Sequence, residues 1–233
     1  MQNANSRRSA FITGGTGYLG RHLIPELVRR GHEVRALVRR GSELKLATGC
    51  KAVFGNALDA SSFADAVPPA DTFVQLVGTP KPSPAKAKQF RELDLVAGLA
   101  GLEAAKRAGI RHFVYVSVAH PAPVMKAYIG VREEVENAIH RSSIPATILR
   151  PWYILGPGHR WPYALIPFYL LMERLPATRD SAQRLGLVTL TQMVWALVEA
   201  VENPGERTVE VQGIRRAATA GASSLAPLSS PSA

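Results

Sequence analysis

The sequence predicts an α/β fold in which helices cover both faces of a parallel sheet, and three observations point to it. Short apolar runs alternate with longer amphipathic stretches up to Arg150, a pattern typical of βαβ units. A glycine-rich turn at residues 13–20 joins the first apolar run to the first helical stretch. Crossovers between parallel strands are right-handed, so successive units build a doubly wound sheet of the Rossmann type.

Hydrophobic periodicity gives the expected elements in order. Strands are predicted at residues 9–13, 33–38, 51–54, 72–77, 112–116 and 146–149. The helices expected between them are at residues 21–30, 61–66, 85–108 and 124–141. After Arg150 comes a Pro- and Gly-rich loop, and then an aromatic helix at 161–174, a strand at 186–190, a helix at 191–202 and a last strand at 208–212.

Length and composition predict the domain organisation. The 233 residues suffice for one α/β domain with a sizeable core, expected over residues 9–216 after a polar N-terminal extension at 1–8. A small C-terminal lobe on the substrate side is expected at about residues 151–212. The segment from residue 217 to 233 is rich in Ala, Ser, Gly and Pro, which predicts a disordered tail.

Composition also narrows the function classes. The single cysteine, Cys50, excludes a disulfide within the chain and fits a reducing compartment, and no signal peptide or membrane span is seen, so a cytoplasmic location is expected. The net charge of +10 comes from scattered Lys and Arg residues rather than one basic, aromatic block, so a nucleic-acid partner is not expected. The six histidines lack metal-ligand spacing, and no metal site is expected.

The glycine-rich turn predicts a dinucleotide site. Gly14 and Gly17 have no Cβ atoms, so the backbone can turn tightly and approach a pyrophosphate, while Gly20 lets the helix pack close to the strand. Backbone N–H groups and the positive end of the helix dipole then face the phosphates. The expected cofactor contacts from this turn are Gly14, Thr16, Gly17, Tyr18, Leu19 and Gly20.

The end of the second predicted strand selects between the two nicotinamide dinucleotides. An acid at this position would accept hydrogen bonds from the ribose 2′-OH of NAD, whereas a basic residue accommodates the 2′-phosphate of NADP. The chain has Arg39 and Arg40 here and no acid. The guanidinium of Arg39 can offer a bidentate fork to a phosphate, which favours NADPH over NAD. The alternative is that both arginines are solvated surface charges.

These motifs resemble the short-chain dehydrogenase/reductase superfamily, together with Gly55–Asp59 after the third strand and Leu76–Thr79 after the fourth. More narrowly they resemble its atypical, NmrA-like NAD(P)H-binding branch, a relative of the complex I accessory-subunit group. The resemblance covers about residues 9–212. It implies cofactor contacts from Asn56, Ala57 and Leu58 near the adenine, and from Val77, Gly78 and Thr79 further along. Asn56 replaces the commoner Asp, and its amide can still pair with an adenine edge.

A catalytic set is implied by the same resemblance. Ser117 ends the fifth strand, and Tyr128 and Arg132 are four residues apart on one helical face. The family pattern is Tyr-x-x-x-Lys with a preceding serine, in which the tyrosine is the general acid/base, the serine orients the substrate carbonyl and the lysine holds the nicotinamide ribose. Arg132 keeps the charge but is a planar fork on a longer stem. A working reductase and a pocket lining without catalysis both stay open.

The segment after the sixth strand resembles the superfamily's LRP…GPG stretch beside the nicotinamide. It implies cofactor contacts from Pro151, Trp152, Tyr153 and Ile154. The aromatic residues of the following helix have three readings: a cover for the substrate, core packing, or a peripheral contact with a membrane or a lipidic substrate such as a quinone. These residues are Trp161, Tyr163, Phe168 and Tyr169.

Taken together, the residues and the resemblance predict an NADP-preferring oxidoreductase. It would transfer a hydride between the nicotinamide and a small carbonyl or alcohol substrate, with Tyr128, Ser117 and Arg132 as the catalytic set. The alternative is a non-catalytic NAD(P)H-binding protein that senses redox state or assists assembly of a complex, as relatives of this branch do. The replacement of lysine by Arg132 motivates this alternative.

Overall fold

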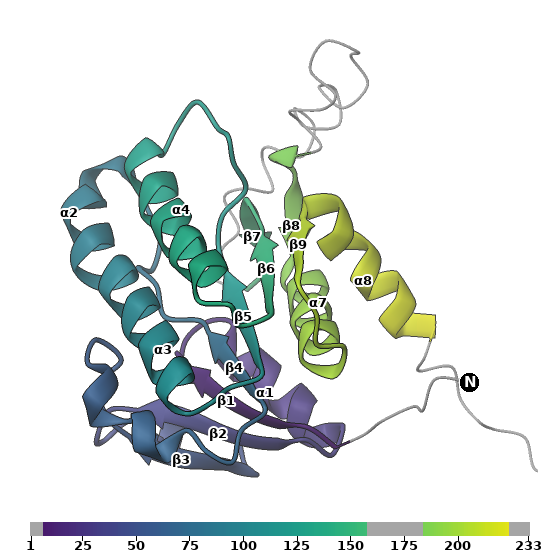
Figure 1. Cartoon of the computed structure of the whole chain (residues 1–233). Helices are drawn as coiled ribbons and strands as arrows, with labels where there is room; N and C mark the ends of the chain where they lie inside the picture. Colours follow the sequence, from purple (N-terminus) through teal and green to yellow (C-terminus); the bar gives the residue numbers. More distant parts are fainter. Residues whose placement is uncertain (1–6, 158–183, 224–233) are drawn as a thin grey trace, which may run out of the picture.

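Seven strands form one sheet in the order β3-β2-β1-β4-β5-β6-β9, and every pairing between neighbours is parallel (Figure 1). The structure is a computed structural model that describes residues 7–157 and 184–223. The strands are β1 (Ser9–Thr13), β2 (Glu33–Val38), β3 (Cys50–Phe54), β4 (Thr72–Gln75), β5 (His112–Val116), β6 (Ala146–Arg150) and β9 (Arg207–Glu210). This order confirms the predicted doubly wound Rossmann-type fold, and its direction reverses between β1 and β4.

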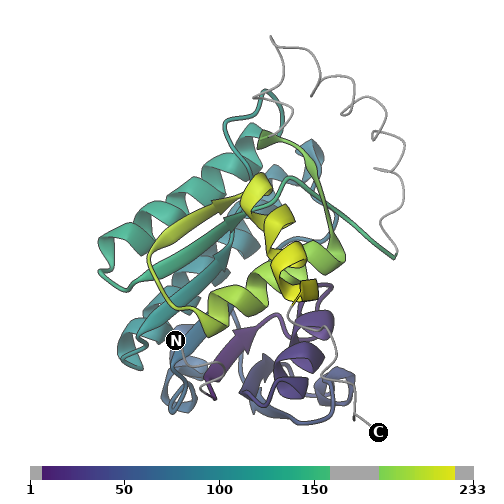
Figure 2. The same cartoon turned by 90° about the vertical axis from the view of Figure 1, so that its right-hand side faces the viewer.

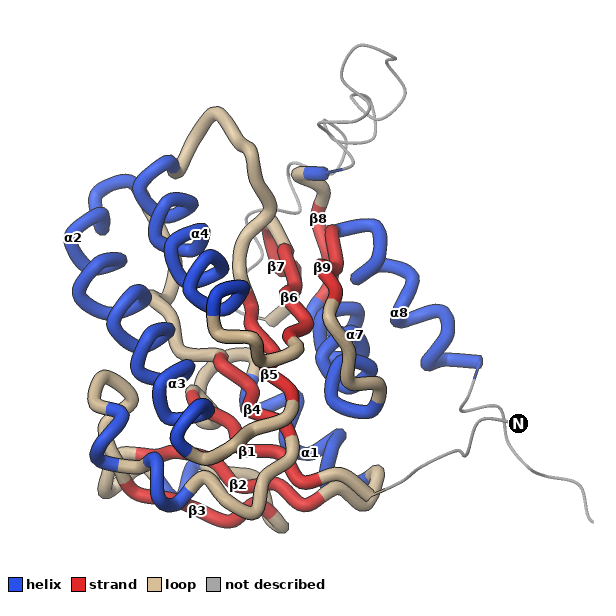
Figure 3. The backbone as a smooth tube through the Cα atoms, viewed as in Figure 1, coloured by secondary structure: helices blue, strands red, loops and turns tan. Residues whose placement is uncertain are grey.

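Alternation of side chains along the strands builds a hydrophobic core on each face of the sheet. In β1, Ala10 and Ile12 belong to one core and Phe11 to the other. The first core lies under α1 (Gly20–Arg29) and α7 (Leu190–Glu202), and the second under α3 (Val96–Arg107) and α4 (Lys126–Arg141). Figure 3 shows the sheet as a middle layer between these two groups of helices.

The second core is rich in aromatic rings. Phe11 stacks against Phe63 at 6.0 Å between ring centroids, and Phe73 stacks against Phe113 at 5.3 Å. Burying large apolar rings supplies much of the stabilisation of a core of this kind. This packed core supports the strands whose carboxyl ends form the edge at which ligands bind in this fold.

Shorter elements complete the structure. Two turns of 3₁₀ helix, η2 (Ala60–Ser62) and η3 (Ala64–Ala66), replace the single helix predicted at 61–66. The predicted helix at 85–108 is divided into η4 (Pro84–Lys86), α2 (Ala87–Gln89), a π-helical turn η5 (Phe90–Leu95) and α3. A further 3₁₀ turn, η1 (Glu43–Lys45), follows β2. The π-helical turn contains a buried acid, Asp94.

The C-terminal part differs most from the sequence prediction. The segment predicted as a loop after Arg150 contains a strand, β7 (Tyr153–Leu155), which pairs in parallel with β8 (Leu187–Thr189). Helix α8 (Val211–Ser223) continues past residue 217, into the segment that the sequence predicts to be a disordered tail. Its buried residues Val211, Ile214 and Ala217 belong to the same core as α7, and Figure 2 shows the two helices side by side.

Some predictions fall outside the described residues. The aromatic helix with Trp161, Tyr163, Phe168 and Tyr169 lies within residues 158–183, which the structure does not describe. The first six residues and residues 224–233 are likewise outside it. Among the helices of the described ranges, none has the length and apolar character needed to cross a membrane.

Candidate dinucleotide and substrate site

The glycine turn lies at the carboxyl edge of the sheet, between β1 and the first residue of α1. Gly14 has a φ of +74°, a left-handed conformation that favours glycine, and its carbonyl accepts a 2.9 Å hydrogen bond from the Gly17 N–H. A Cβ on Gly20 would overlap the carbonyl oxygens of Gly14 and Gly15. No acidic residue occupies the first turn of α1, so the positive end of its dipole is not neutralised there. This cradle fits a pyrophosphate.

The loop after β4 lies directly against the glycine turn. A Cβ added to Gly14 would be 2.9 Å from the carbonyl carbon of Leu76 and 3.0 Å from the nitrogen of Val77. The turn and the predicted contacts Val77, Gly78 and Thr79 therefore meet where the strand order reverses, the position at which open α/β sheets bind ligands.

The end of β2 presents two basic side chains. Arg39 and Arg40 are exposed, and neither forms an ion pair within the residues that the structure describes. The Arg40 guanidinium lies 5.4 Å from the ring centroid of Phe54, a cation–π distance. Both arginines are thus available to an anionic group at this edge.

The predicted adenine contacts follow β3. The Asn56 side-chain oxygen accepts a hydrogen bond of 3.1 Å from the Leu58 N–H, so it stabilises the local turn. Asn56 and Leu58 are exposed and Ala57 is half-buried. The amide nitrogen of Asn56 is the group left to contact a base.

Arg132 is buried and bound to the protein on several sides. Its Nη2 lies 2.5 Å from the Asp94 carboxylate, and its Nη1 donates to the Tyr115 hydroxyl at 3.2 Å and to the Val116 carbonyl at 3.1 Å. Burial by itself disfavours the charged guanidinium, but Tyr115, Tyr128 and Asp94 together outweigh it and hold the pKa of Arg132 above its ordinary value. Both terminal nitrogens are engaged inside the protein, so Arg132 does not present them to a ribose as the family lysine is expected to do.

The Asp94 carboxylate also binds the loop after β4. It accepts hydrogen bonds from the backbone N–H of Thr79 at 3.1 Å and from the Thr79 hydroxyl at 2.5 Å. Asp94 is 1% exposed. Sequence reasoning missed this residue, although an acid between Leu93 and Leu95 in an apolar stretch was a usable signal.

Tyr128 lies on the first turn of α4, half-buried. Its ring centroid is 4.9 Å from that of Phe90 at an interplanar angle of 56°, and the Arg132 guanidinium carbon is 5.0 Å from the same ring. Among the described residues, no hydrogen bond is made to its hydroxyl. The ring is therefore held from two sides while its oxygen is available to a ligand.

Ser117 is tied to a second polar cluster. Its hydroxyl donates to the buried carboxylate of Glu136, which also forms an ion pair with Arg150. Burial tends to raise the pKa of Glu136, but hydrogen bonds from Arg150 and Ser117 lower it overall, so the carboxylate is ionised and can only accept. The single proton of Ser117 is committed to Glu136, and towards a ligand its oxygen acts as an acceptor. Glu136 was not among the predicted site residues.

The same cluster connects α4 with β9 and the loop after β5. Arg150 Nη1 also reaches Glu210 at 3.0 Å, and His120 Nδ1 lies 3.2 Å from Glu133. These contacts fix the end of β6, from which the predicted nicotinamide-side segment leaves.

That segment lies beside the rest of the site. The buried Pro151 accepts a hydrogen bond of 2.9 Å from the Ala119 N–H through its carbonyl oxygen, and the Trp152 and Tyr153 rings pack edge to face at 5.6 Å. Gly156 lies against the Tyr18 hydroxyl, where a Cβ would overlap it. Ile154, in β7, is half-buried. The structure thus brings the segments after β1, β4, β5 and β6 to one edge.

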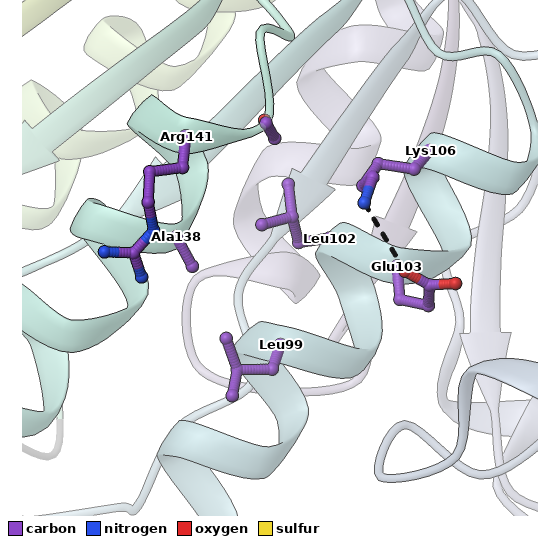
Figure 4. A pocket seen from close by; sticks show the side chains of 7 residues that line it. Leu99, Leu102, Glu103, Lys106, Ala138 and Arg141 are labelled. Carbon is purple, nitrogen blue, oxygen red and sulfur yellow. Dashed lines mark ion pairs between the residues drawn. The ribbon is translucent and has the colours of Figure 1, made fainter.

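A separate hollow lies between α3 and α4. It is lined by Leu99, Leu102, Glu103, Lys106, Ala138, Arg141 and Ser142 (Figure 4). Its α3 residues are spread from the first turn of that helix to its last, and its α4 side is formed at the C-terminal end of that helix. None of the predicted site residues lines this hollow, so it is not part of the candidate site. In the described ranges, no three His, Cys, Asp or Glu side chains are grouped as a metal site.

Comparison with known proteins identifies the family. The sequence model of a family described as NAD(P)H-binding matches residues 14–163. A ceramide reductase of Caulobacter vibrioides is 28% identical over 220 residues, which cover 91% of this chain and 67% of the relative. The photosystem II assembly factor Ycf39 of Trieres chinensis is 28% identical over 61% of this chain. A chloroplastic divinyl chlorophyllide a 8-vinyl-reductase of Oryza sativa subsp. indica is 30% identical over 64% of this chain. The matches span only 44% and 40% of those two relatives.

Solved structures agree on the fold. The Bordetella bronchiseptica enzyme WbmH in complex with NAD+ superposes with a TM-score of 0.66 at 20% identity, covering 97% of this chain and 85% of that one. A UDP-N-acetylglucosamine 4-epimerase from Bacillus cereus gives a TM-score of 0.64 at 15% identity, covering 87% and 78%. The chain therefore belongs to the NAD(P)H-binding family, whose model matches well over half of its residues.

Proposed function

We propose that the protein is an NADP(H)-dependent oxidoreductase that acts on a small carbonyl or alcohol compound, with Tyr128 as the proton donor and acceptor. The observation that carries the proposal is the Tyr128 hydroxyl, which has no hydrogen-bond partner in the described structure while its ring is held by Phe90 and Arg132. A bound nicotinamide dinucleotide supplies or takes up the hydride. The names of the ceramide and divinyl chlorophyllide reductases support a reductive direction.

The remaining predicted residues have supporting roles in this proposal. The glycine turn and the N-terminus of α1 bind the pyrophosphate, and Arg39 with Arg40 binds the 2′-phosphate that distinguishes NADP from NAD. Arg132 acts through the position of the Tyr128 ring rather than by holding a ribose. Ser117 offers a hydrogen-bond acceptor, which suits the hydroxyl of an alcohol.

The test is NADPH oxidation with a panel of aldehydes and ketones, for the wild type and for Tyr128→Phe. General acid catalysis contributes about 10²–10⁴-fold to a rate, so we expect Tyr128→Phe to lower turnover by at least about a hundredfold. The dissociation constant for NADPH and the unfolding temperature should stay unchanged, which separates a lost proton donor from a damaged site. Undiminished turnover in Tyr128→Phe would contradict the assignment.

One observation favours a second candidate, a non-catalytic NAD(P)H-binding protein that senses redox state or assists assembly. The Ser117 proton goes to Glu136 and both terminal nitrogens of Arg132 are engaged, so two of the three expected catalytic groups are turned to the protein. The photosystem II assembly factor is a relative whose name fits this class. Measurable NADPH binding without turnover of any carbonyl would support this candidate over the first.

A further inference from the structure

One buried carboxylate connects three parts of the candidate site. Asp94 binds Thr79 in the loop after β4 and Arg132 in α4, and Arg132 in turn reaches the Val116 carbonyl at the end of β5. Asp94 is 1% exposed and Arg132 is 5% exposed, so the connections run through the interior. Thr79 is a residue that the cofactor-binding loop itself contributes.

Asp94 lies in the π-helical turn η5, which places its carboxylate between Thr79 and Arg132. The turn begins at Phe90, whose ring packs against Tyr128, and it ends at Leu95, next to Asp94. A π-helical turn inserts an extra residue into a helix and often occurs at functional sites. The same turn therefore sets the position of the Tyr128 ring directly and that of Arg132 through Asp94.

We propose that Asp94 is a positioning residue for the dinucleotide: its carboxylate holds the Thr79 loop and Arg132 at one time, and thereby sets cofactor affinity without touching the cofactor. The role in affinity depends only on dinucleotide binding. The effect on turnover through Tyr128 rests on the proposed function.

The hydrogen-bond geometry requires a carboxylate at this position. Thr79 donates through both its N–H and its hydroxyl, and Arg132 donates through Nη2, so the partner must accept three hydrogen bonds. An ionised Asp has about four acceptor sites, whereas an Asn presents an NH₂ group on one side that cannot accept. Gly78 completes the arrangement, because a Cβ there would be 2.5 Å from Arg132 Nη2 and 3.1 Å from Asp94 Oδ1.

The primary test is Asp94→Asn, which keeps the size of the side chain. We expect the dissociation constant for NADPH, measured by fluorescence titration well below the unfolding temperature, to rise roughly tenfold, as for the loss of a hydrogen bond to a charged group. Thr79→Val leaves the Asp94–Arg132 pair in place and should raise the same constant by a smaller factor.

A double variant separates positioning from folding. Asp94→Leu with Arg132→Met replaces the buried ion pair by an apolar pair, an exchange that often preserves stability. We expect its unfolding temperature to return towards that of the wild type while the NADPH affinity stays low, because Thr79 has lost its acceptor. Recovery of both quantities would show that the pair is only structural, and this variant carries the test if Asp94→Asn does not fold.

Thr147→Val is the matched control. Thr147 is buried at the start of β6, and its hydroxyl donates to the Gly205 carbonyl at 2.9 Å. This position lies at the amino edge of the sheet, far from the glycine turn. The variant should lower the unfolding temperature and leave NADPH binding unchanged. If Asp94→Asn behaves in the same way, the proposal is overturned. Because the readout is binding, a wild type without turnover refutes the proposed reductase and leaves this test intact.

Discussion

In the proposed function, the exposed side chains of Arg39 and Arg40 at the end of β2 distinguish NADP from NAD by its 2′-phosphate. Arg39→Asp replaces a guanidinium proposed to bind the 2′-phosphate by a carboxylate, which repels a phosphate and can accept a hydrogen bond from a ribose hydroxyl. We expect the wild type to bind NADPH about ten- to a hundredfold more tightly than NADH, the range of one charge-assisted contact, and the variant to narrow or reverse this ratio. Parallel titrations with both dinucleotides measure it.

Arg141→Asp is a control for this experiment, since it changes the net charge by the same amount at the far end of α4. It should leave the ratio of the two affinities unchanged. Equal affinities for NADPH and NADH in the wild type would refute the role of Arg39.

At the scale of residues, local chemistry was predictable and long-range partnership was not. The glycine turn and the spacing of Tyr128 and Arg132 are local patterns. In the structure the turn joins β1 to α1, and Tyr128 and Arg132 both lie in α4, as the sequence predicts. Asp94 and Glu136 form ion pairs with residues distant in the sequence, Arg132 and Arg150, and hydrophobic periodicity does not predict such pairs. For the same reason the sequence could not show that the Arg132 guanidinium is engaged inside the protein.

The start of α1 depends on one position without a side chain. An alanine at Gly20 would overlap two carbonyl oxygens of the glycine turn, so the helix must move away from the phosphate site. We expect Gly20→Ala to lower the free energy of unfolding by about 1–3 kcal/mol, as for other overpacked positions, and to weaken NADPH binding more than tenfold. Chemical denaturation and a titration measure the two effects.

Gly130 in α4 gives a comparison for this change, because a Cβ there meets nothing within 4 Å. Gly130→Ala should stabilise the helix by up to about 1 kcal/mol and leave dinucleotide binding as it is. Similar behaviour of the two alanine variants would contradict the packing argument at Gly20.

Among the elements, the strands were the most predictable. The bounds of β1, β2 and β5 agree with the sequence prediction, because each is a short apolar run between turn residues. The π-helical turn η5 was not predictable, since the extra residue is accommodated by the tertiary contacts of Phe90 and Asp94. Helix α8 was missed because its composition resembles a disordered tail, while its core contacts at Val211 and Ile214 become visible only in the fold.

The pH dependence of the free energy of unfolding is a property of the whole molecule. We expect His112 in β5 to contribute strongly to it, because folding shifts the pKa of this side chain. Burial, then the charge of Arg207, lowers the pKa of His112 from 6.5 to about 4. The Thr147 hydroxyl donates to a carbonyl, so the ring donates to Thr147 through Nε2, and within the described residues its Nδ1 has no partner to accommodate a proton.

Between these two values the unfolded chain binds a proton that the folded protein does not. The free energy of unfolding should therefore fall as the pH is lowered from 6.5 to about 4, by up to about 2–3 kcal/mol. In His112→Gln, whose amide still donates to Thr147, this slope should flatten. Urea denaturation at several pH values checks it, and parallel curves for the two proteins would count against the explanation.

At the scale of the molecule, the fold class was the most secure prediction. Alternating strand and helix patterns admit few topologies once crossovers are right-handed, and the observed strand order is one of them. The strand predicted at 186–190 is present as β8, but its pairing with β7 was not foreseen, because β7 is only three residues long and lies in a segment predicted as a loop.

The parallel sheet also has a consequence for engineering. The seven strands of the main sheet point the same way, so the loops after their carboxyl ends gather at one edge, whereas the buried His112–Thr147 pair lies at the other. Residues that affect ligand affinity and residues that affect only the free energy of unfolding therefore lie largely at different edges of the sheet. A stabilised background could be built at the amino edge and then diversified in the loops after β4, β5 and β6 to screen for new substrates, because changes at well-separated sites combine almost additively.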